Sequence, residues 1–353
     1  MKKKVISIIL MIVMMVTIVP YGTGSPENSM AASTHTMKIT WFNVGAGDSV
    51  FIKLPNGKNV LIDGGTKSKG ASIVKKLKNK HVSKIHYMIS THPDADHAGG
   101  LQYVLKKMKV YNFYYPGDAP YTTNTAKELI RLVKKEGCKR IHPRQDRYIK
   151  GGYGCKLEFV QRNKDYSTSN QDSLAMFLDY GNLEVLFAGD NEKGSQNAIE
   201  KHNADIVMLP HHGSKYATTS TFIKRFDPER VVVSTDGHKY GHPNKEVFRR
   251  LRSYDKHIKA YRTDKKGDIT VTANSKKWSF DKKGTYVRYY CNDTKKPDAD
   301  QNSKDKTYVY ITATGKKYHS TPRCRGLANA KKVYKVKKKD AIAKHLEPCK
   351  LCY

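Results

Sequence analysis

The sequence predicts an α/β protein whose core is two packed β-sheets with helices on the outside, followed by a small separate unit. Strand-like stretches come first along the chain and then alternate with helix-like stretches up to about residue 280. That order is typical of stacked sheets whose outer faces are covered by helices. A polar stretch at 281–306 reads as a linker between this domain, 37–280, and a lysine-rich unit at 307–353.

The first strands of the domain have the clearest pattern. Residues 37–44, MKITWFNV, alternate like a half-buried strand. Residues 55–57, Pro-Asn-Gly, are a hairpin turn signal between strands expected at 49–54 and 59–63.

The later elements follow from the same periodicities, and Gly137 supplies a C-terminal stop for one helix. The remaining expected strands are 85–90, 111–115, 155–160, 173–180, 183–188, 205–209, 230–235, 258–262 and 268–273, and the expected helices are 72–80, 101–109, 125–136, 192–201, 219–226 and 244–254.

One stretch, residues 91–100, holds four metal-ligand side chains on a strand-to-helix turn. They are His92, Asp94, Asp96 and His97. Further candidate ligands also follow expected strands, namely Asp190, His211, His212 and His242. Functional groups on loops at strand ends, held by a rigid scaffold, are a common arrangement. The sequence therefore predicts a catalytic metal site.

The donors suit two divalent cations, zinc or manganese. His92 and Asp94 lie two residues apart and can share one metal, whereas Asp96 and His97 point elsewhere and can serve a second. Asp190 is placed to bridge them. Two metals about 3.5–4 Å apart hold a hydroxide and stabilise an in-line displacement at phosphorus.

Seven segments of the domain together resemble the metallo-β-lactamase superfamily, in particular the extracellular hydrolase domain of ComEC/Rec2-type DNA-uptake channels and its secreted relatives. These segments are 42–49, 61–65, 91–100, 170–174, 187–190, 209–214 and 240–243. The resemblance implies an αββα sandwich and a metal-dependent hydrolase.

The resemblance also implies roles for individual residues. The residues at 92, 94, 96 and 97 correspond to the metal-binding turn, Asp190 to the bridging aspartate and His242 to the last ligand. His211 and His212 line the site, where one ligates or hydrogen-bonds the scissile group; with Asp96 they are the expected catalytic residues.

Two departures from the wider superfamily pattern bear on the metal. Asp94 stands where a histidine is commoner, and the mid-chain histidine is absent, with Asn170, Asp172 and Ser173 in its place. These departures, shared by the ComEC-like branch, make the first metal position richer in oxygen and favour Mn²⁺ over Zn²⁺ there. Asp48 and Asp63 either orient ligand histidines or serve only as turn formers.

The C-terminal unit carries His319, Cys324, Cys349 and Cys352, a spacing typical of a structural Cys₃His zinc site. A disulfide is the alternative in an exported protein, and Cys138 could pair with Cys155. The unit resembles the small zinc-binding domain of Ada-type repair proteins.

Residues 301–353 carry 12 lysines and 2 arginines against 3 acidic residues, which with interleaved tyrosines suggests a surface for polyanions.

The N-terminus has the form of a signal peptide at 1–32. Three lysines precede an apolar run at 5–19 that is shorter than the ~20 residues a spanning helix needs. We therefore expect a secreted protein with no stable membrane insertion after cleavage; cell-surface association and an uncleaved anchor remain alternatives.

The formal net charge of +33 attracts polyanions, unless it is only a solvated basic surface. The leading hypothesis is a secreted phosphodiesterase or nuclease that cleaves extracellular DNA or RNA with a metal-bound hydroxide. The alternatives are a hydrolase of another ester or amide, including cell-wall phosphodiesters, and a non-catalytic protein that binds nucleic acid or anionic cell-wall polymers.

Overall fold

The computed structural model describes residues 35–117, 120–143, 147–161, 168–291 and 308–352, the last range with gaps at 323, 331, 339–340, 342–343, 345 and 350–351. The expected signal peptide and the expected linker beyond Cys291 lie outside the described residues. Within the described part, none of the helices combines the length and apolar character needed to cross a bilayer.

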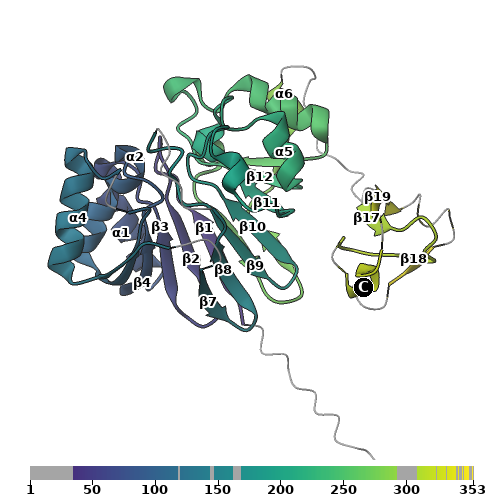
Figure 1. Ribbon diagram of the computed structural model, residues 1–353, viewed down its shortest axis with the longest axis horizontal. Coiled ribbons are helices and arrows are strands. Elements are labelled where there is room, and N and C mark those ends of the chain that lie inside the picture. Colours follow the sequence, from purple (N-terminus) through teal and green to yellow (C-terminus); the bar gives the residue numbers. More distant parts are fainter. Residues whose placement is uncertain are drawn as a thin grey trace, which may run out of the picture. The chain divides into compact units, whose positions relative to one another are not determined.

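Two eight-stranded sheets form the large domain (Figure 1). In spatial order, the first sheet holds β15 (Trp278–Phe280), β14 (Ile269–Ala273), β1 (Met37–Trp41), β2 (Val50–Lys53), β3 (Asn59–Ile62), β4 (Lys84–Ile89), β5 (Lys109–Tyr114) and β6 (Lys139–Ile141). The second holds β16 (Thr285–Tyr286), β13 (Lys259–Arg262), β12 (Arg230–Val233), β11 (Ile206–Met208), β10 (Leu183–Phe187), β9 (Met176–Tyr180), β8 (Cys155–Phe159) and β7 (Tyr148–Gly152).

Each sheet mixes two kinds of pairing. Strands joined by hairpins are antiparallel, as in β1 with β2 and β8 with β9. Strands joined through a helix or a longer connection are parallel, as in β3 with β4 and β11 with β12. Parallel neighbours end at the same edge of a sheet, so loops that follow them lie close together.

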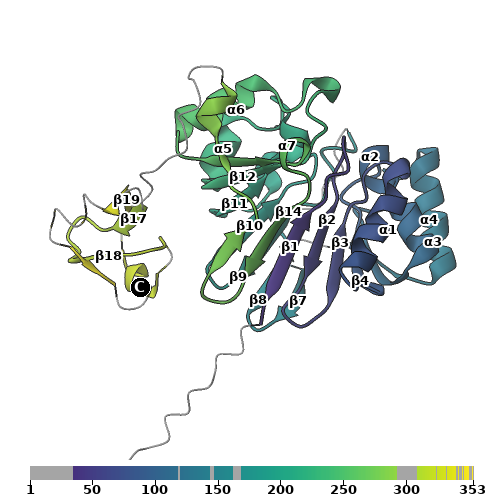
Figure 2. The ribbon, with the colours of Figure 1, turned by 180° about the vertical axis from the view of Figure 1, so that it is seen from behind.

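Helices cover the outer face of each sheet (Figures 1 and 2). The first sheet is covered by α1 (Gly70–Asn79), α2 (Ala95–Ala98), α3 (Leu101–Lys107) and α4 (Asn124–Glu136), and the second by α5 (Ser220–Phe226) and α6 (Lys245–Tyr254), with α7 (Thr263–Lys266) following β13.

Three hydrophobic clusters correspond to the three interfaces between the four layers. The central cluster joins both sheets, for example where the fully buried Trp41 of β1 lies 6.1 Å from the Phe187 ring of β10. A second packs the first sheet against α1, α3 and α4, and a third packs the second sheet against α5 and α6. These layers confirm the expected αββα sandwich.

Several elements differ from the sequence prediction. The helix expected at 192–201 is only a short 3₁₀ turn, Gln196–Ala198, because the Asn191 and Ser195 side chains are engaged in local hydrogen bonds. Strands β6 and β7 were not predicted. Packed structure also extends past 280, since β16 pairs with β13 and Cys291 is buried.

The C-terminal module, defined by its described residues from Tyr308 onward, contains two small sheets. One pairs β17 (Tyr308–Ile311) with β19 (Tyr334–Lys337), and the other pairs β18 (Lys317–Tyr318) with β20 (Glu347–Pro348). Its apolar cluster is small, with Val309, Ile311, Tyr318 and Ala341 as the buried members. A core of this size does not stabilise a fold without a cross-link or a metal.

One half-buried carboxyl makes the stability of the domain depend on pH. Burial, with the Glu229 carboxylate nearby, raises the pKa of Asp205 to about 7. In the unfolded chain the Asp205 carboxyl loses its proton at about pH 3.9. Its contribution to the unfolding free energy is therefore complete below that pH and is lost as the pH rises through about 7. Asp205→Asn retains an oxygen that can accept the Glu184 N–H. Between about pH 5 and pH 8, we expect the unfolding free energy of this variant to fall by about 3 kcal/mol less than that of the wild type.

Chemical denaturation at several pH values measures this effect. Asp281 is a suitable control, because this exposed carboxylate also accepts a backbone N–H, from Thr270. A wild-type pH profile that survives in Asp205→Asn would rule out this carboxyl as its source.

Candidate metal centre

The candidate site is built from loops that follow strands of both sheets. β4 leads into His92, and the short helix α2 carries Asp96 and His97. Asp190 follows β10, and the 3₁₀ turn η3 (Pro210–Gly213) after β11 carries the remaining histidine pair. Thus the ends of two sheets that face each other bring the ligand groups together.

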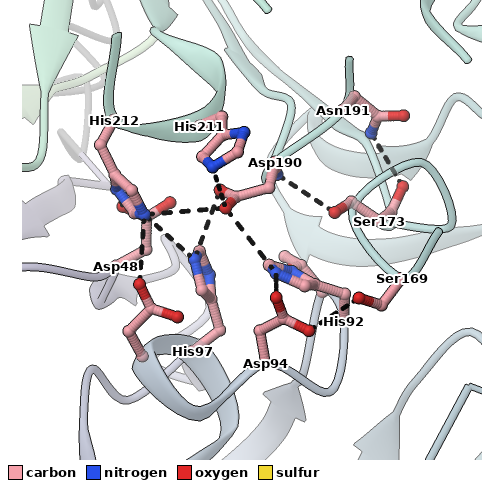
Figure 3. A network of polar contacts seen from close by, with 12 residues as sticks. Asp48, His92, Asp94, His97, Ser169, Ser173, Asp190, Asn191, His211 and His212 are labelled. Carbon is pink, nitrogen blue, oxygen red and sulfur yellow. Dashed lines mark hydrogen bonds and ion pairs between the residues drawn. The ribbon is translucent and has the colours of Figure 1, made fainter. Parts of the chain in front are cut away.

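Four histidines surround the buried carboxylate of Asp190 (Figure 3). The His97 Nε2 atom lies 3.3 Å from Oδ1 of Asp190. The Nε2 atoms of His212, His92 and His211 lie 3.7, 3.8 and 3.8 Å from its Oδ2 atom. His92, His97 and His212 are buried, whereas His211 keeps 23% of its side chain exposed.

Two of these rings have an aspartate behind them, hydrogen-bonded in one case and at ion-pair distance in the other. His97 Nδ1 lies 2.9 Å from Asp63 Oδ2, and His212 Nδ1 lies 3.2 Å from Asp48 Oδ1. His212 Nδ1 also lies 3.1 Å from the Ser234 carbonyl oxygen, to which it donates. A partner on Nδ1 sets the tautomer that leaves Nε2 free for a metal, and it orients the ring. The geometry thus favours the orienting role for Asp63.

The other two rings have different supports. Thr91 Oγ1 lies 3.0 Å from His92 Nδ1 and itself donates to Asp63 Oδ2 at 2.6 Å, so one aspartate supports two neighbouring ligands. His211 Nδ1 lies 3.1 Å from Glu192 Oε1. Sequence reasoning missed Thr91 and Glu192, because their spacing from the histidines carries no signal.

Asp94 and Asp96 occupy the rim of the site. Asp94 Oδ2 lies 3.8 Å from His92 Nε2, while its Oδ1 accepts a hydrogen bond from Ser169 at 2.7 Å. Asp96 Oδ2 lies 3.6 Å from His212 Nε2. Asp94 is therefore close to His92, with which the sequence groups it, whereas Asp96 faces His212.

Ser173 is one of the three residues that stand where the resemblance leads us to expect a mid-chain histidine. Its hydroxyl accepts the Asp190 backbone N–H at 3.1 Å, and its side chain is fully buried. The serine thus positions the central aspartate and does not supply a nitrogen ligand.

Opposite charges dominate the electrostatics of the site. Burial alone would lower the pKa of His97 and His212, but the Asp190 carboxylate and the aspartates behind the rings outweigh it and hold both values well above the ordinary range. Burial would raise the pKa of Asp190, yet the same histidines hold it well below its usual value. The pKa of His92 is lowered, by burial first and by His97 second.

The unsatisfied atoms of the site fit a cation. The Nε2 atom of His92, Oδ1 of Asp190 and Oδ1 of Asp48 are buried and make no hydrogen bond within the described structure. Leaving such a group without a partner costs about 1–3 kcal/mol. One ligand atom from each of Asp48, His97, Asp190 and His212 lies within 4.8 Å of the others. Imidazole and carboxylate donors in this arrangement suit a divalent metal.

His242 is less central to the site, and His212 more central, than the sequence predicts. The His242 ring lies 5.2 Å from that of His211, its Nδ1 atom lacks a hydrogen bond in the described structure, and its pKa falls to about 4 through burial and the neighbouring histidines. However, it is His212, and not His242, that belongs to the compact group of ligand atoms. Asp48 also joins that group, although its sequence position suggested at most a supporting role.

A glycine explains how Asp48 reaches the site. Gly47 has φ of 110°, and a Cβ atom there would lie 2.1 Å from the Asp96 carbonyl oxygen. Only glycine lets the two loops approach this closely. The Asp48 N–H then donates to that same carbonyl oxygen, at 3.3 Å.

We expect Asp63→Asn to weaken metal binding at this centre about 10- to 100-fold, because the amide cannot accept from both His97 and Thr91 as the carboxylate does. The fold should persist, since the remaining oxygen can still accept the Thr91 N–H. Calorimetric titration with Mn²⁺ and Zn²⁺ measures the affinity, and Asp205→Asn is the control for an aspartate elsewhere in the domain. Unchanged affinity would show that Asp63 does not tune the ligand.

A second group of ligand atoms lies in the C-terminal module. His319, Cys324, Cys349 and Cys352 each offer an atom within 4.8 Å of the others. The Cys324 and Cys349 sulfurs are 3.7 Å apart, and Cys352 Sγ lies 3.8 Å from His319 Nδ1. This compact set could hold one metal ion.

All six cysteines are described, and none of them forms a disulfide in the structure. The expected alternative of a Cys138–Cys155 pair is wrong, because these thiols belong to different hydrophobic clusters on opposite faces of the first sheet. A disulfide requires Cα atoms within about 7 Å and side chains that point toward each other.

Comparison with known proteins identifies relatives of the chain. ComE operon protein 3 of Bacillus subtilis (strain 168) is 26% identical over 260 residues, which cover 66% of this chain and 32% of the relative. Competence protein ComA of Neisseria gonorrhoeae is 26% identical over 252 residues, covering 69% of this chain and 32% of the relative. The chain therefore spans about a third of the length of these curated relatives.

Among solved structures, a metallo-beta-lactamase from Cronobacter sakazakii aligns with 48% of this chain and 75% of its own, at 13% identity and a TM-score of 0.36. The profile of the metallo-beta-lactamase superfamily matches residues 42–238, more than half of the chain and all of the ligand loops except the one that carries His242. The chain belongs to the metallo-beta-lactamase superfamily, and its relatives include the ComEC family of competence proteins.

Proposed function

We propose that the protein is an exported metal-dependent phosphodiesterase that cleaves DNA or RNA outside the cell. The observation that carries the proposal is the buried Asp190 carboxylate, shared by four histidine rings from loops of both sheets. The competence proteins among the relatives favour a nucleic-acid substrate. The net charge of +33 favours a polyanion.

The proposed ligands divide into two groups that share Asp190. His92 and Asp94 would hold one cation, and Asp96, His97 and His212 a second, with Asp48 beside the second group and His242 at the rim. The first group has more oxygen than nitrogen donors once Asp190 is included, which favours Mn²⁺ there, whereas the second also suits Zn²⁺. When bound, such cations supply Lewis-acid stabilisation of charge on the phosphoryl oxygens.

The protein's own groups position the substrate. His211 is the most accessible of the four central histidines, and Glu192 fixes its Nδ1 atom so that Nε2 faces the site. We assign it to hydrogen-bond a phosphoryl oxygen or the leaving oxygen of the scissile phosphate. The buried walls around His92 and His97 exclude bulk water and strengthen each electrostatic interaction there.

The remaining parts of the chain have supporting roles in the proposal. Residues 1–32 direct export, and the linker beyond Cys291 connects the hydrolase domain to the module at 307–353. A structural zinc ion at the Cys₃His group stabilises the module, whose basic side chains hold an anionic strand.

The test incubates the purified chain with plasmid and single-stranded DNA and RNA in Mn²⁺, Zn²⁺ or Mg²⁺, beside an Asp96→Ala/His97→Ala variant. Cleavage by the wild type that disappears in the variant supports the proposal. Binding without cleavage under every metal would instead indicate a polyanion-binding protein. Cleavage that survives in the double variant would refute the assigned site, and hydrolysis of teichoic acid alone would move the substrate to the cell wall.

A further inference from the structure

Two lysine–tyrosine pairs adjoin the loops of the candidate metal centre in the sequence. Lys215-Tyr216 comes shortly after His212, and Lys239-Tyr240 shortly before His242. Tyr240 is 73% exposed and Tyr216 is 66% exposed, the highest values among the large hydrophobic side chains that the structure describes. Isolated exposed aromatics are ordinary, but here the two most exposed ones both adjoin ligand loops.

Tyr240 is connected to the metal centre by a small cleft. Its lining includes Asp96, His212 and His242 of the centre together with Lys239 and Tyr240. The Tyr240 ring lies 6.4 Å from the ring of His242. A substrate whose phosphate reaches Asp96 and His212 would therefore place its neighbouring groups near Tyr240.

The loop that carries Tyr240 is held in place although the ring itself is exposed. Tyr240 has a left-handed backbone, with φ of 56°, which is unusual for a bulky residue. Asp236 accepts the N–H groups of His238 and Lys239, and Thr235 donates to the His242 carbonyl oxygen. A strained backbone that its surroundings maintain is commonest at ligand-binding positions.

Each tyrosine has the adjacent ammonium over its ring. Lys239 Nζ lies 4.8 Å from the Tyr240 centroid, and Lys215 Nζ lies 5.0 Å from the Tyr216 centroid. An aromatic face next to a cation suits a nucleotide, because the ring can stack on a base while the ammonium approaches a phosphate. The Asp236 carboxylate already accepts hydrogen bonds from two backbone N–H groups of the same loop.

We propose that Tyr240 and Tyr216 are base-stacking residues that make single-stranded nucleic acid the preferred substrate. The inference rests on the proposed function for its substrate class and adds the strand form. In a duplex the bases are already stacked on one another, so no base face is available to the two tyrosine rings. In a single strand every base offers a face, whatever its sequence.

The test measures binding separately from cleavage. A short labelled single-stranded oligonucleotide is titrated, without chelator, with the full chain in the Asp96→Ala/His97→Ala background, in which no cleavage is expected, and fluorescence anisotropy gives the affinity. The same strand with abasic sites and the matched duplex are titrated in parallel. Tyr240→Ala and Tyr216→Ala should each weaken binding of the intact strand by roughly 5- to 150-fold. Neither should alter binding of the abasic strand, and Tyr240→Phe should bind like the wild type.

Tyr148→Ala is the matched control. Tyr148 is also exposed and also has lysines over its ring, Lys150 and Lys156, but it belongs to the edge strand β7 and not to a ligand loop. Its replacement should leave the affinity unchanged. Wild-type affinity in Tyr240→Ala, or an equal loss on intact and abasic strands, would overturn the stacking proposal.

Cleavage assays with metal then separate the two proposals. If no nucleic acid is cleaved but Tyr240→Ala still loses base-dependent binding, the phosphodiesterase proposal fails and stacking stands. If the wild type cleaves while Tyr240→Ala binds intact and abasic strands as the wild type does, the phosphodiesterase proposal stands and stacking fails.

Discussion

Replacing Asp190 with asparagine is expected to eliminate metal binding at the hydrolase centre. Its carboxylate is the one group approached by all four histidines, and it is 3% exposed. The amide has the same shape but lacks the charge, and its NH₂ group would face an imidazole nitrogen. Because changes to residues behind the ligands alone cost 10- to 100-fold in affinity, we expect a loss of more than about 100-fold here.

The same change should also destabilise the metal-free protein. The Asp190 carboxylate holds the pKa of His97 and His212 above the ordinary range, so its removal leaves these buried imidazoles without their main counter-charge. Breaking a buried charge pair typically costs about 3–5 kcal/mol, less whatever is recovered when the imidazoles lose their protons.

Metal analysis after dialysis and chemical denaturation measure the two effects. The C-terminal module is an internal reference for metal content, since Asp190→Asn should leave its metal in place, and Asp205→Asn is the metal-content control for an aspartate outside the centre. Wild-type metal content at the hydrolase centre of Asp190→Asn would show that Asp190 does not bridge the ligands.

Replacing Cys349 with serine is expected to unfold the C-terminal module while leaving the hydrolase domain intact. The module has a small apolar cluster, and its four ligand residues come from positions between His319 and Cys352 that a metal would tie together. Structural zinc contributes about 10–16 kcal/mol in small zinc-binding peptides, so the loss of one ligand removes most of the stability of such a unit.

Limited proteolysis and zinc content measure this outcome. The variant should lose one equivalent of zinc and become rapidly cleaved after Cys291. Cys138→Ser makes the same chemical change at a buried thiol outside both ligand groups and should keep its zinc. A module that withstands chelators but unfolds under reducing agent would instead identify a disulfide.

The sandwich could be predicted because its strands alternate and its turns are marked. The Pro-Asn-Gly turn between β2 and β3, and the buried runs of β10 and β11, are local signals that tertiary contacts did not override. The predicted helix at 192–201 was wrong because Asn191, which is fully buried, captures local hydrogen-bonding groups. Pattern alone does not distinguish a helix from a loop closed by side chains.

By itself the sequence determined that His92, Asp94, Asp96 and His97 lie together, since six consecutive residues on one turn cannot separate. It also placed Asp190 and His212 at strand ends. Only the tertiary structure decided that Asp63 supports His97, that Asp48 joins the ligand group and that His212 lies closer to Asp190 than His242 does. These relations depend on how loops from two sheets approach one another, at Gly47 and at the left-handed histidines of η3, and no spacing along the chain encodes that approach.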